Sequence, residues 1–135
     1  MNNFTLADEY VIDTVGLILY LENRKSGTHA EQICNSAESG QTVIHIPAMV
    51  LAEILYLSEK GRISVKLTDV FQLLRDHTNF KEFPMNGDVL ETAAQITDIP
   101  ELHDRLISAT AKLMDLELIT NDPKIKTSTF VKTVW

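Results

Sequence analysis

Four acidic side chains lie within or directly after apolar segments, where an ionised group is unexpected. Asp13 follows the strand-like residues 10–12, and Asp122 closely follows a later apolar run. Asp104 lies in the first turn of a largely apolar helical segment, and Glu53 has apolar or aromatic neighbours three and four positions away on its own predicted helix. A buried carboxylate without a partner is strongly disfavoured. Glu53, which should be at least partly buried, therefore needs a cation, a bound metal ion or a raised pKa.

Each acid also has an ordinary structural explanation, and for a single residue that explanation stays open. Asp13 can cap the helix that follows it, and Glu53 can reach solvent and pair with an arginine. Asp104 can complement the dipole of its helix or pair with Arg105, and Asp122 belongs to the turn-forming sequence N-D-P. Because four such acids occur in one chain, a single explanation that applies to all of them is preferable to four separate ones.

A divalent metal ion is the common explanation that the chemistry of carboxylates favours. Two carboxylates about 4 Å apart repel by roughly 1 kcal/mol in water, and by several times more at an effective dielectric constant near 20. A bound ion removes this repulsion, and all-oxygen ligands select Mg²⁺ or Mn²⁺. An ion that keeps some of its waters can activate one of them as a nucleophile and stabilise charge at phosphorus.

The elements that must position these acids alternate along the chain. Strands are expected over residues 10–12, 42–46, 79–83, 118–120 and 130–134, the last at an edge of the sheet. Helices are expected over 15–22, 28–39 (capped by Thr28), 47–60, 64–77, 88–96, 100–114 and 123–126, and residues 1–7 are expected to fray. This alternation predicts an α/β three-layer sandwich with a mainly parallel central sheet flanked by helices. Ligands bind at the carboxyl edge of such sheets, where the strands preceding Asp13 and Asp122 end.

The composition is that of an ordinary globular protein, and the 135 residues predict a single domain over 1–135. The net charge of −7 argues against a general polyanion-coating protein and is compatible with an acidic, metal-collecting site. Cys34 is the only cysteine, which excludes an internal disulfide and favours a reducing compartment. Neither a signal peptide nor a membrane span is recognisable, so we expect a cytoplasmic protein.

Four sequence segments carry a resemblance to a known family: Y-V-I-D-T at 10–14, L-A-E-I-L-Y-L at 51–57, I-P-E-L-H-D-R-L-I-S-A-T-A at 99–111 and L-I-T-N-D-P-K-I at 118–125. In order and spacing they resemble PIN-domain ribonucleases, and among these the VapC-type toxins of toxin–antitoxin pairs. The third segment followed by the fourth is the most specific part of this resemblance. The resemblance as a whole covers essentially the full length of the chain.

The resemblance implies a fold and an activity. It implies a PIN-like fold and Mg²⁺- or Mn²⁺-dependent cleavage of single-stranded or loop RNA, by a homodimer whose site a cognate antitoxin covers. Asp13, Asp104 and Asp122 would be direct metal ligands, and Glu53 would position a metal ion or a water molecule. Thr14 and Thr120 match small hydroxyl positions that line the site, whereas Val15 takes a place that is often Ser or Ala in the family.

Five basic side chains are the candidates for phosphate contacts, with an ordinary solvated charge as the alternative for each. They are Arg24 and Lys25, in the loop after the first helix, and Arg105, Lys124 and Lys126, near the acids. The four histidines show no ligand spacing and are interpreted as structural, although His103 lies beside Asp104.

The sequence lacks residues that two other classes of phosphate-handling protein require. A haloacid-dehalogenase-like phosphatase needs a second acid two residues after the first, and Val15 stands there. A receiver domain needs paired acids ending its first strand and a lysine closing a late one, but Asp8 and Glu9 precede the strand and no lysine directly follows residues 118–120. A catalytically silent PIN-like module that acts through RNA or a protein partner remains open.

Overall fold

The structure is a computed structural model that describes residues 4–135. Its strands are β1 (Glu9–Ile12), β2 (Val43–Pro47), β3 (Phe80–Phe83), β4 (Leu118–Ile119) and β5 (Thr133–Val134). Its helices are α1 (Thr14–Leu21), α2 (Thr28–Glu38), α3 (Ala48–Glu59), α4 (Leu67–Asp76), α5 (Gly87–Gln95), α6 (Leu102–Met114) and α7 (Pro123–Lys126). Residues 4–7 form no helix or strand. Residues 1–3, the rest of the segment expected to fray, lie outside the described part.

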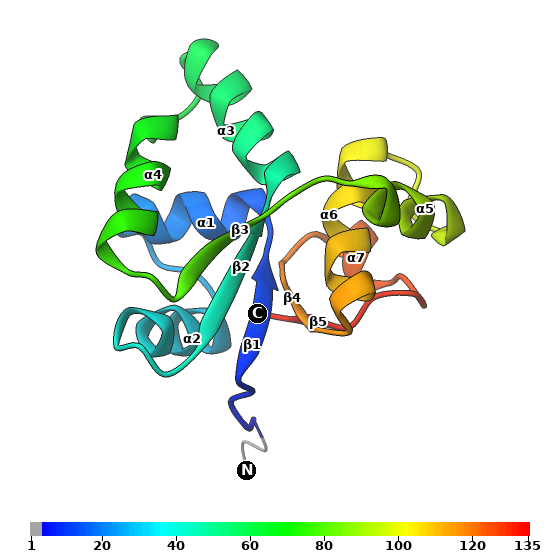
Figure 1. Ribbon diagram of the computed structural model, residues 1–135, viewed down its shortest axis with the longest axis horizontal. Coiled ribbons are helices and arrows are strands. Elements are labelled where there is room, and N and C mark those ends of the chain that lie inside the picture. Colours follow the sequence, from blue (N-terminus) through cyan, green and yellow to red (C-terminus); the bar gives the residue numbers. More distant parts are fainter. Residues whose placement is uncertain (1–3) are drawn as a thin grey trace.

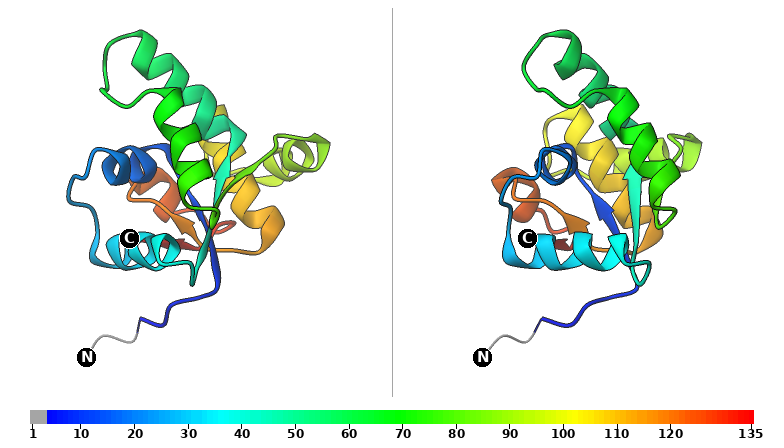
Figure 2. Two further views of the ribbon diagram at one scale, coloured as in Figure 1. Left: turned by 60° about the vertical axis from the view of Figure 1, so that its left-hand side comes forward. Right: turned by 90° about the vertical axis from the view of Figure 1, so that its left-hand side faces the viewer.

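The five strands form one sheet in the order β3-β2-β1-β4-β5, and each neighbouring pair is parallel. Helices α1, α2 and α4 lie on one side of the sheet, and α5, α6 and α7 lie on the other (Figure 1). Helix α3 extends beyond the end of β2 and packs beside α4 (Figure 2). The predicted α/β three-layer sandwich is confirmed, as is the position of the last strand at an edge.

The strand order creates a reversal point between β1 and β4. The chain leaves β1 towards β2 and β3 on one side, and later crosses the sheet to form β4 on the other side of β1. Clefts at such reversal points, outside the carboxyl ends of the strands, are the usual ligand sites of open parallel sheets. The register aligns Ile12 of β1 with Ile119 of β4, so the residues that follow these strands emerge next to each other.

The central strands are buried because helices cover both faces of the sheet. Tyr10, Ile12, Ile44, Leu118 and Ile119 are all completely buried. The two-residue strand β4 therefore contributes no solvent-facing side chain, which explains its continuous rather than alternating apolar sequence. Within residues 4–135, no helix combines the length and apolar character that crossing a membrane would require.

Most element ends agree with the prediction within one or two residues, but α4 and β5 are each at least three residues shorter than predicted. Helix α4 begins at Leu67 instead of residue 64, because the Ser64 hydroxyl donates to the Glu22 carboxylate (2.7 Å) and holds that loop against the end of α1. Strand β5 contains two residues instead of the five predicted over 130–134. The residues preceding it form a turn held by Asp98, which accepts from the Ser128 hydroxyl and the Thr129 N–H.

The predicted cap of α2 by the Thr28 side chain is wrong. The N-cap position is occupied by Gly27, which has no side chain that could accept a hydrogen bond. Instead, the backbone oxygen of Trp135 accepts hydrogen bonds from the N–H groups of His29 (2.9 Å) and Ala30 (3.0 Å). A residue more than 100 positions away thus supplies the acceptor that helix N-termini require. Gly27 allows this approach, since a β-carbon there would lie 2.4 Å from the Trp135 carbonyl.

Candidate functional site

A pocket of about 470 Å³ opens at the reversal point of the sheet. Four elements contribute an acid to it, and these acids are the four singled out in the sequence: Asp13 after β1, Glu53 on α3, Asp104 on α6 and Asp122 after β4. Its remaining lining residues are Thr14, Val15, Leu57, Ile107, Asn121, Pro123 and Ile125. The tertiary structure therefore brings the predicted quartet together in one place.

Asp13 is almost completely buried, at 7% exposure. Its Oδ1 caps α1 by accepting from the Gly16 N–H (2.8 Å), so the capping role expected for this residue is real. Burial raises the pKa of Asp13 to about 6, against the opposing effects of hydrogen bonds from Thr120 and Gly16. The charges of Asp122 and Glu53 raise it further. Asp13 is thus a carboxylate whose ionised form this environment disfavours.

Glu53 is half-buried, and its partner is a hydroxyl instead of the arginine considered above. The Thr14 hydroxyl donates to Oε1 of Glu53 and joins the first turn of α1 to α3. The other oxygen, Oε2, lies 3.6 Å from Nδ1 of His103. The same imidazole nitrogen lies 3.7 Å from Oε1 of Glu101, so His103 stands between two carboxylates. His103, interpreted as structural from the sequence, thus lies beside the carboxylate pocket.

Asp104 lines the pocket from the first turn of α6, and Asp122 lines it from the start of α7. Desolvation raises the pKa of Asp104 to about 6, and the charges of Asp122, Glu101 and Glu53 add to the rise, while Lys124 lowers it. Asp122 caps α7 by accepting from the Lys124 N–H (2.9 Å). Its own N–H donates to the completely buried hydroxyl of Thr120 (3.1 Å).

The donor set suits a hard divalent cation, because it consists of carboxylate and hydroxyl oxygens in a partly dehydrated pocket. Burial is the main cause of the raised pKa values of Asp13 and Asp104, and neighbouring carboxylates add to both shifts, so a bound cation would favour the ionised forms. Among residues 4–135, no three His, Cys, Asp or Glu side chains already stand in the arrangement of a metal site. The residues therefore fit such an ion by chemistry and charge, and binding it requires the carboxylates to draw together.

The basic residues considered for phosphate contacts are divided by the fold. Arg24 and Lys25 follow α1 at the end opposite Asp13, about 12 Å away for a helix of eight residues, and Arg24 pairs with Glu22 (3.0 Å). Arg105 is half-buried, and its Nε is buried without a described partner. Lys124 lies beside the pocket, close enough to lower the pKa values of Asp104 and Glu101.

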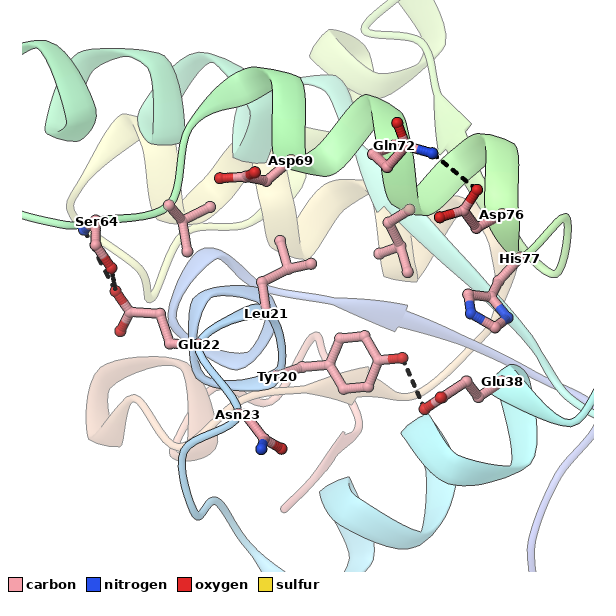
Figure 3. Close-up of a pocket in the computed structure, with 12 residues that line it drawn as sticks. Tyr20, Leu21, Glu22, Asn23, Glu38, Ser64, Asp69, Gln72, Asp76 and His77 are labelled. Atoms are coloured by element: carbon pink, nitrogen blue, oxygen red, sulfur yellow. Dashed lines mark hydrogen bonds between the residues drawn. The ribbon is translucent and has the colours of Figure 1, made fainter.

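A second cavity, of about 530 Å³, lies between α1, α2 and α4 (Figure 3). It also contains acids, but these are engaged with neighbours: Tyr20 donates to Glu38 (2.9 Å), and Gln72 donates to Asp76 (2.8 Å). Its larger size therefore does not make it the better candidate, because its acids do not converge.

The fold and the pocket define a class: a parallel α/β domain with a carboxylate cluster at the reversal point of its sheet. The PIN domain family matches residues 10–129, and the chain belongs to this family. The resemblance noted in the sequence is thereby confirmed. Among curated proteins, none matches this chain.

Solved structures with the same fold come from toxin–antitoxin systems. A chain of VapBC2 from Rickettsia felis, bound to a DNA fragment from its promoter, is 16% identical, with a TM-score of 0.70 over 94% of this chain and 98% of that one. DNA-bound VapBC from Salmonella typhimurium is 16% identical, with a TM-score of 0.68 over 95% and 98%. VapC20 from Mycobacterium tuberculosis, a Sarcin-Ricin loop cleaving toxin, is 17% identical, with a TM-score of 0.65 over 91% and 97%.

Proposed function

We propose that this protein is a metal-dependent ribonuclease that hydrolyses RNA phosphodiester bonds, and that it is the toxin of a type II toxin–antitoxin pair. One observation carries the nuclease proposal: four carboxylates from four separate elements converge on one pocket at the reversal point of the sheet. Capping alone explains Asp13 and Asp122, but it does not explain why Glu53 and Asp104 face the same pocket. Membership of the PIN domain family agrees with a nuclease.

The proposed roles follow from the position of each side chain. Asp13, Asp104 and Asp122 would hold Mg²⁺ or Mn²⁺, while Glu53, anchored through Thr14, would orient the attacking water and accept its proton. When bound, the ion supplies a Lewis acid for the phosphodiester and lowers the pKa of a coordinated water. Thr14 and Thr120 hold the carboxylates that they contact, and Lys124 would contact a phosphate beside the scissile one.

The direct test is cleavage of bacterial total RNA in Mn²⁺ or Mg²⁺ by the wild type and by Asp104→Asn. We expect the variant to lose activity by about 100-fold or more, because one charged ligand is neutral. Its stability should be retained, since Asp104 already resists ionisation. Asp88→Asn is the matched control, because Asp88 also lies in the first turn of a helix but is exposed and outside the pocket. Equal activity of wild type and Asp104→Asn would refute the assignment.

A catalytically silent binding module is the second candidate, and the absence of a ready-made metal arrangement among residues 4–135 favours it. Titration of Mn²⁺ into the wild type, Asp13→Asn and Asp104→Asn by calorimetry separates the two. Binding by the wild type that both variants lose supports a shared metal site. No binding at millimolar Mn²⁺ supports the silent module.

The proposed partners are RNA, a cognate antitoxin and a second copy of the chain, all in the cytoplasm. The similar solved structures include toxin–antitoxin complexes, which supports the antitoxin. Exposed apolar side chains supply surface for protein contacts, among them Tyr56 (53%) and Phe71 (38%), whereas Leu74 packs partly against the core. Light scattering of the purified protein tests the homodimer, and co-purification with the product of an adjacent gene tests the antitoxin.

A further inference from the structure

The two sides of the carboxylate pocket differ in the apolar surface that they expose. Val15 and Leu57 line the pocket together with the four acids. Val15 directly follows Thr14, and Leu57 lies one helical turn after Glu53 on the same face of α3, so both flank the Thr14–Glu53 hydrogen bond. The α6–α7 side carries Asp104 and Asp122, with Lys124 next to them. Its apolar lining residues Ile107 and Ile125 are each only 2% exposed and belong to the core, and Pro123 is exposed beside Asp122.

Val15 gains nothing from the core at this position. Its side chain is 57% exposed, the largest exposed fraction among the large apolar residues described as exposed. It stands in the first turn of α1, which contains no acidic residue, although acids are favoured there and valine is a moderate helix former. An apolar side chain that faces the pocket and not the core is available to a ligand.

We propose that Val15 and Leu57 form the contact surface for one nucleobase of the RNA substrate, with the adjoining phosphodiester facing the acids and Lys124. A nucleotide has the same division as the pocket, an apolar base face joined to a charged phosphate. A base taken out of its stack is commonly held between aromatic or apolar side chains. The volume of about 470 Å³ falls within the range of about 300–1,000 Å³ typical of small-ligand sites.

This inference rests on the proposed ribonuclease function and makes Val15 a residue that selects and positions substrate. The contact between Val15 and a base is lost if either the side chain or the base is removed. The test therefore combines a protein variant with an RNA that lacks the base, and compares the effect of each change alone with the effect of both. Val15→Thr keeps the side-chain shape and adds polarity, while Val15→Ala removes contact area. Val15 is exposed in the free protein, so neither variant should unfold it.

The experiment measures kcat and KM for a single-stranded RNA whose cleavage position has been mapped, and for the same RNA with abasic residues flanking that position. We expect both Val15 variants to raise KM about fivefold for the intact RNA, with kcat little changed, because the apolar contact is formed with the bound substrate. On the abasic RNA the wild type and the variants should have the same KM. Leu90→Thr, an equally exposed apolar position on α5 outside the pocket, is the control and should behave as the wild type.

Different outcomes separate this inference from the function on which it rests. If the wild type cleaves no RNA with Mn²⁺ or Mg²⁺, the ribonuclease proposal fails and the base site fails with it. If the wild type cleaves and the Val15 variants keep the wild-type KM, the base site alone is refuted. An equal penalty on intact and abasic RNA also refutes it, because the effect would then not depend on a base.

Discussion

Replacing Asp13 with asparagine should stabilise the metal-free protein at neutral pH. The Asp13 carboxylate is 7% exposed, and its environment raises the pKa to about 6 from 3.8. Since one pKa unit corresponds to about 1.4 kcal/mol, the ionised side chain costs the folded state about 3 kcal/mol. Asparagine removes the charge and still caps α1 at Gly16, because Asn and Asp are comparable caps. A weaker contact to Thr120 reduces the expected gain to about 2 kcal/mol.

The gain must depend on pH in a defined direction. The folded-state pKa of Asp13 is above the unfolded value, so the folded protein binds this proton more tightly between about pH 4 and pH 6, and the destabilising contribution of Asp13 declines as the pH falls through this window. The advantage of Asp13→Asn is therefore complete above about pH 7 and vanishes near pH 4. Urea unfolding in EDTA at several pH values measures it.

Asp8→Asn is the matched control. It removes the same charge as Asp13→Asn, but at an exposed position outside the pocket. It should alter stability by no more than a few tenths of a kcal/mol at any pH. The reasoning would be refuted if Asp13→Asn were destabilised at pH 7.5, or if its gain did not decline towards pH 4. If the reasoning holds, replacing EDTA with Mn²⁺ should raise the stability of the wild type and leave that of Asp13→Asn unaffected.

Three further changes test other parts of the structure. Gly27→Ala should lower the free energy of unfolding by about 1–3 kcal/mol in denaturant titrations, because its β-carbon would displace Trp135 from the start of α2; unchanged stability would contradict that contact. Thr14→Val should slow RNA cleavage at saturating Mn²⁺ by releasing Glu53, and an unaltered cleavage rate would exclude the anchoring role. Ile119→Ala should cost about 2–5 kcal/mol, measured in the same denaturant titrations, because Ile119 is completely buried in β4; a cost below about 1 kcal/mol would argue against that burial.

The architecture was predictable because it depends on local patterns. Alternation of strand and helix signals predicted the parallel sheet, and the short apolar run before Asp122 predicted a strand over 118–120. The same patterns placed Asp13 and Asp122 at strand ends, where parallel topology alone makes them neighbours. Element ends were less predictable, since α4 and β5 are limited by Ser64 and Asp98, whose bonds join segments distant in sequence.

The fold class, the family and the identity of the four acids could therefore be inferred from local sequence, because strand ends, helix faces and short segments are local properties. How the acids are held depends on contacts between elements that are distant along the chain. Thr14 reaches Glu53 across 39 positions, His103 comes between two carboxylates, and the Trp135 backbone replaces a side-chain cap. The direction of α1 also separates Arg24 from the pocket while Lys124 stays beside it. These contacts depend on how helices pack around the sheet, and no pattern within one segment records that packing.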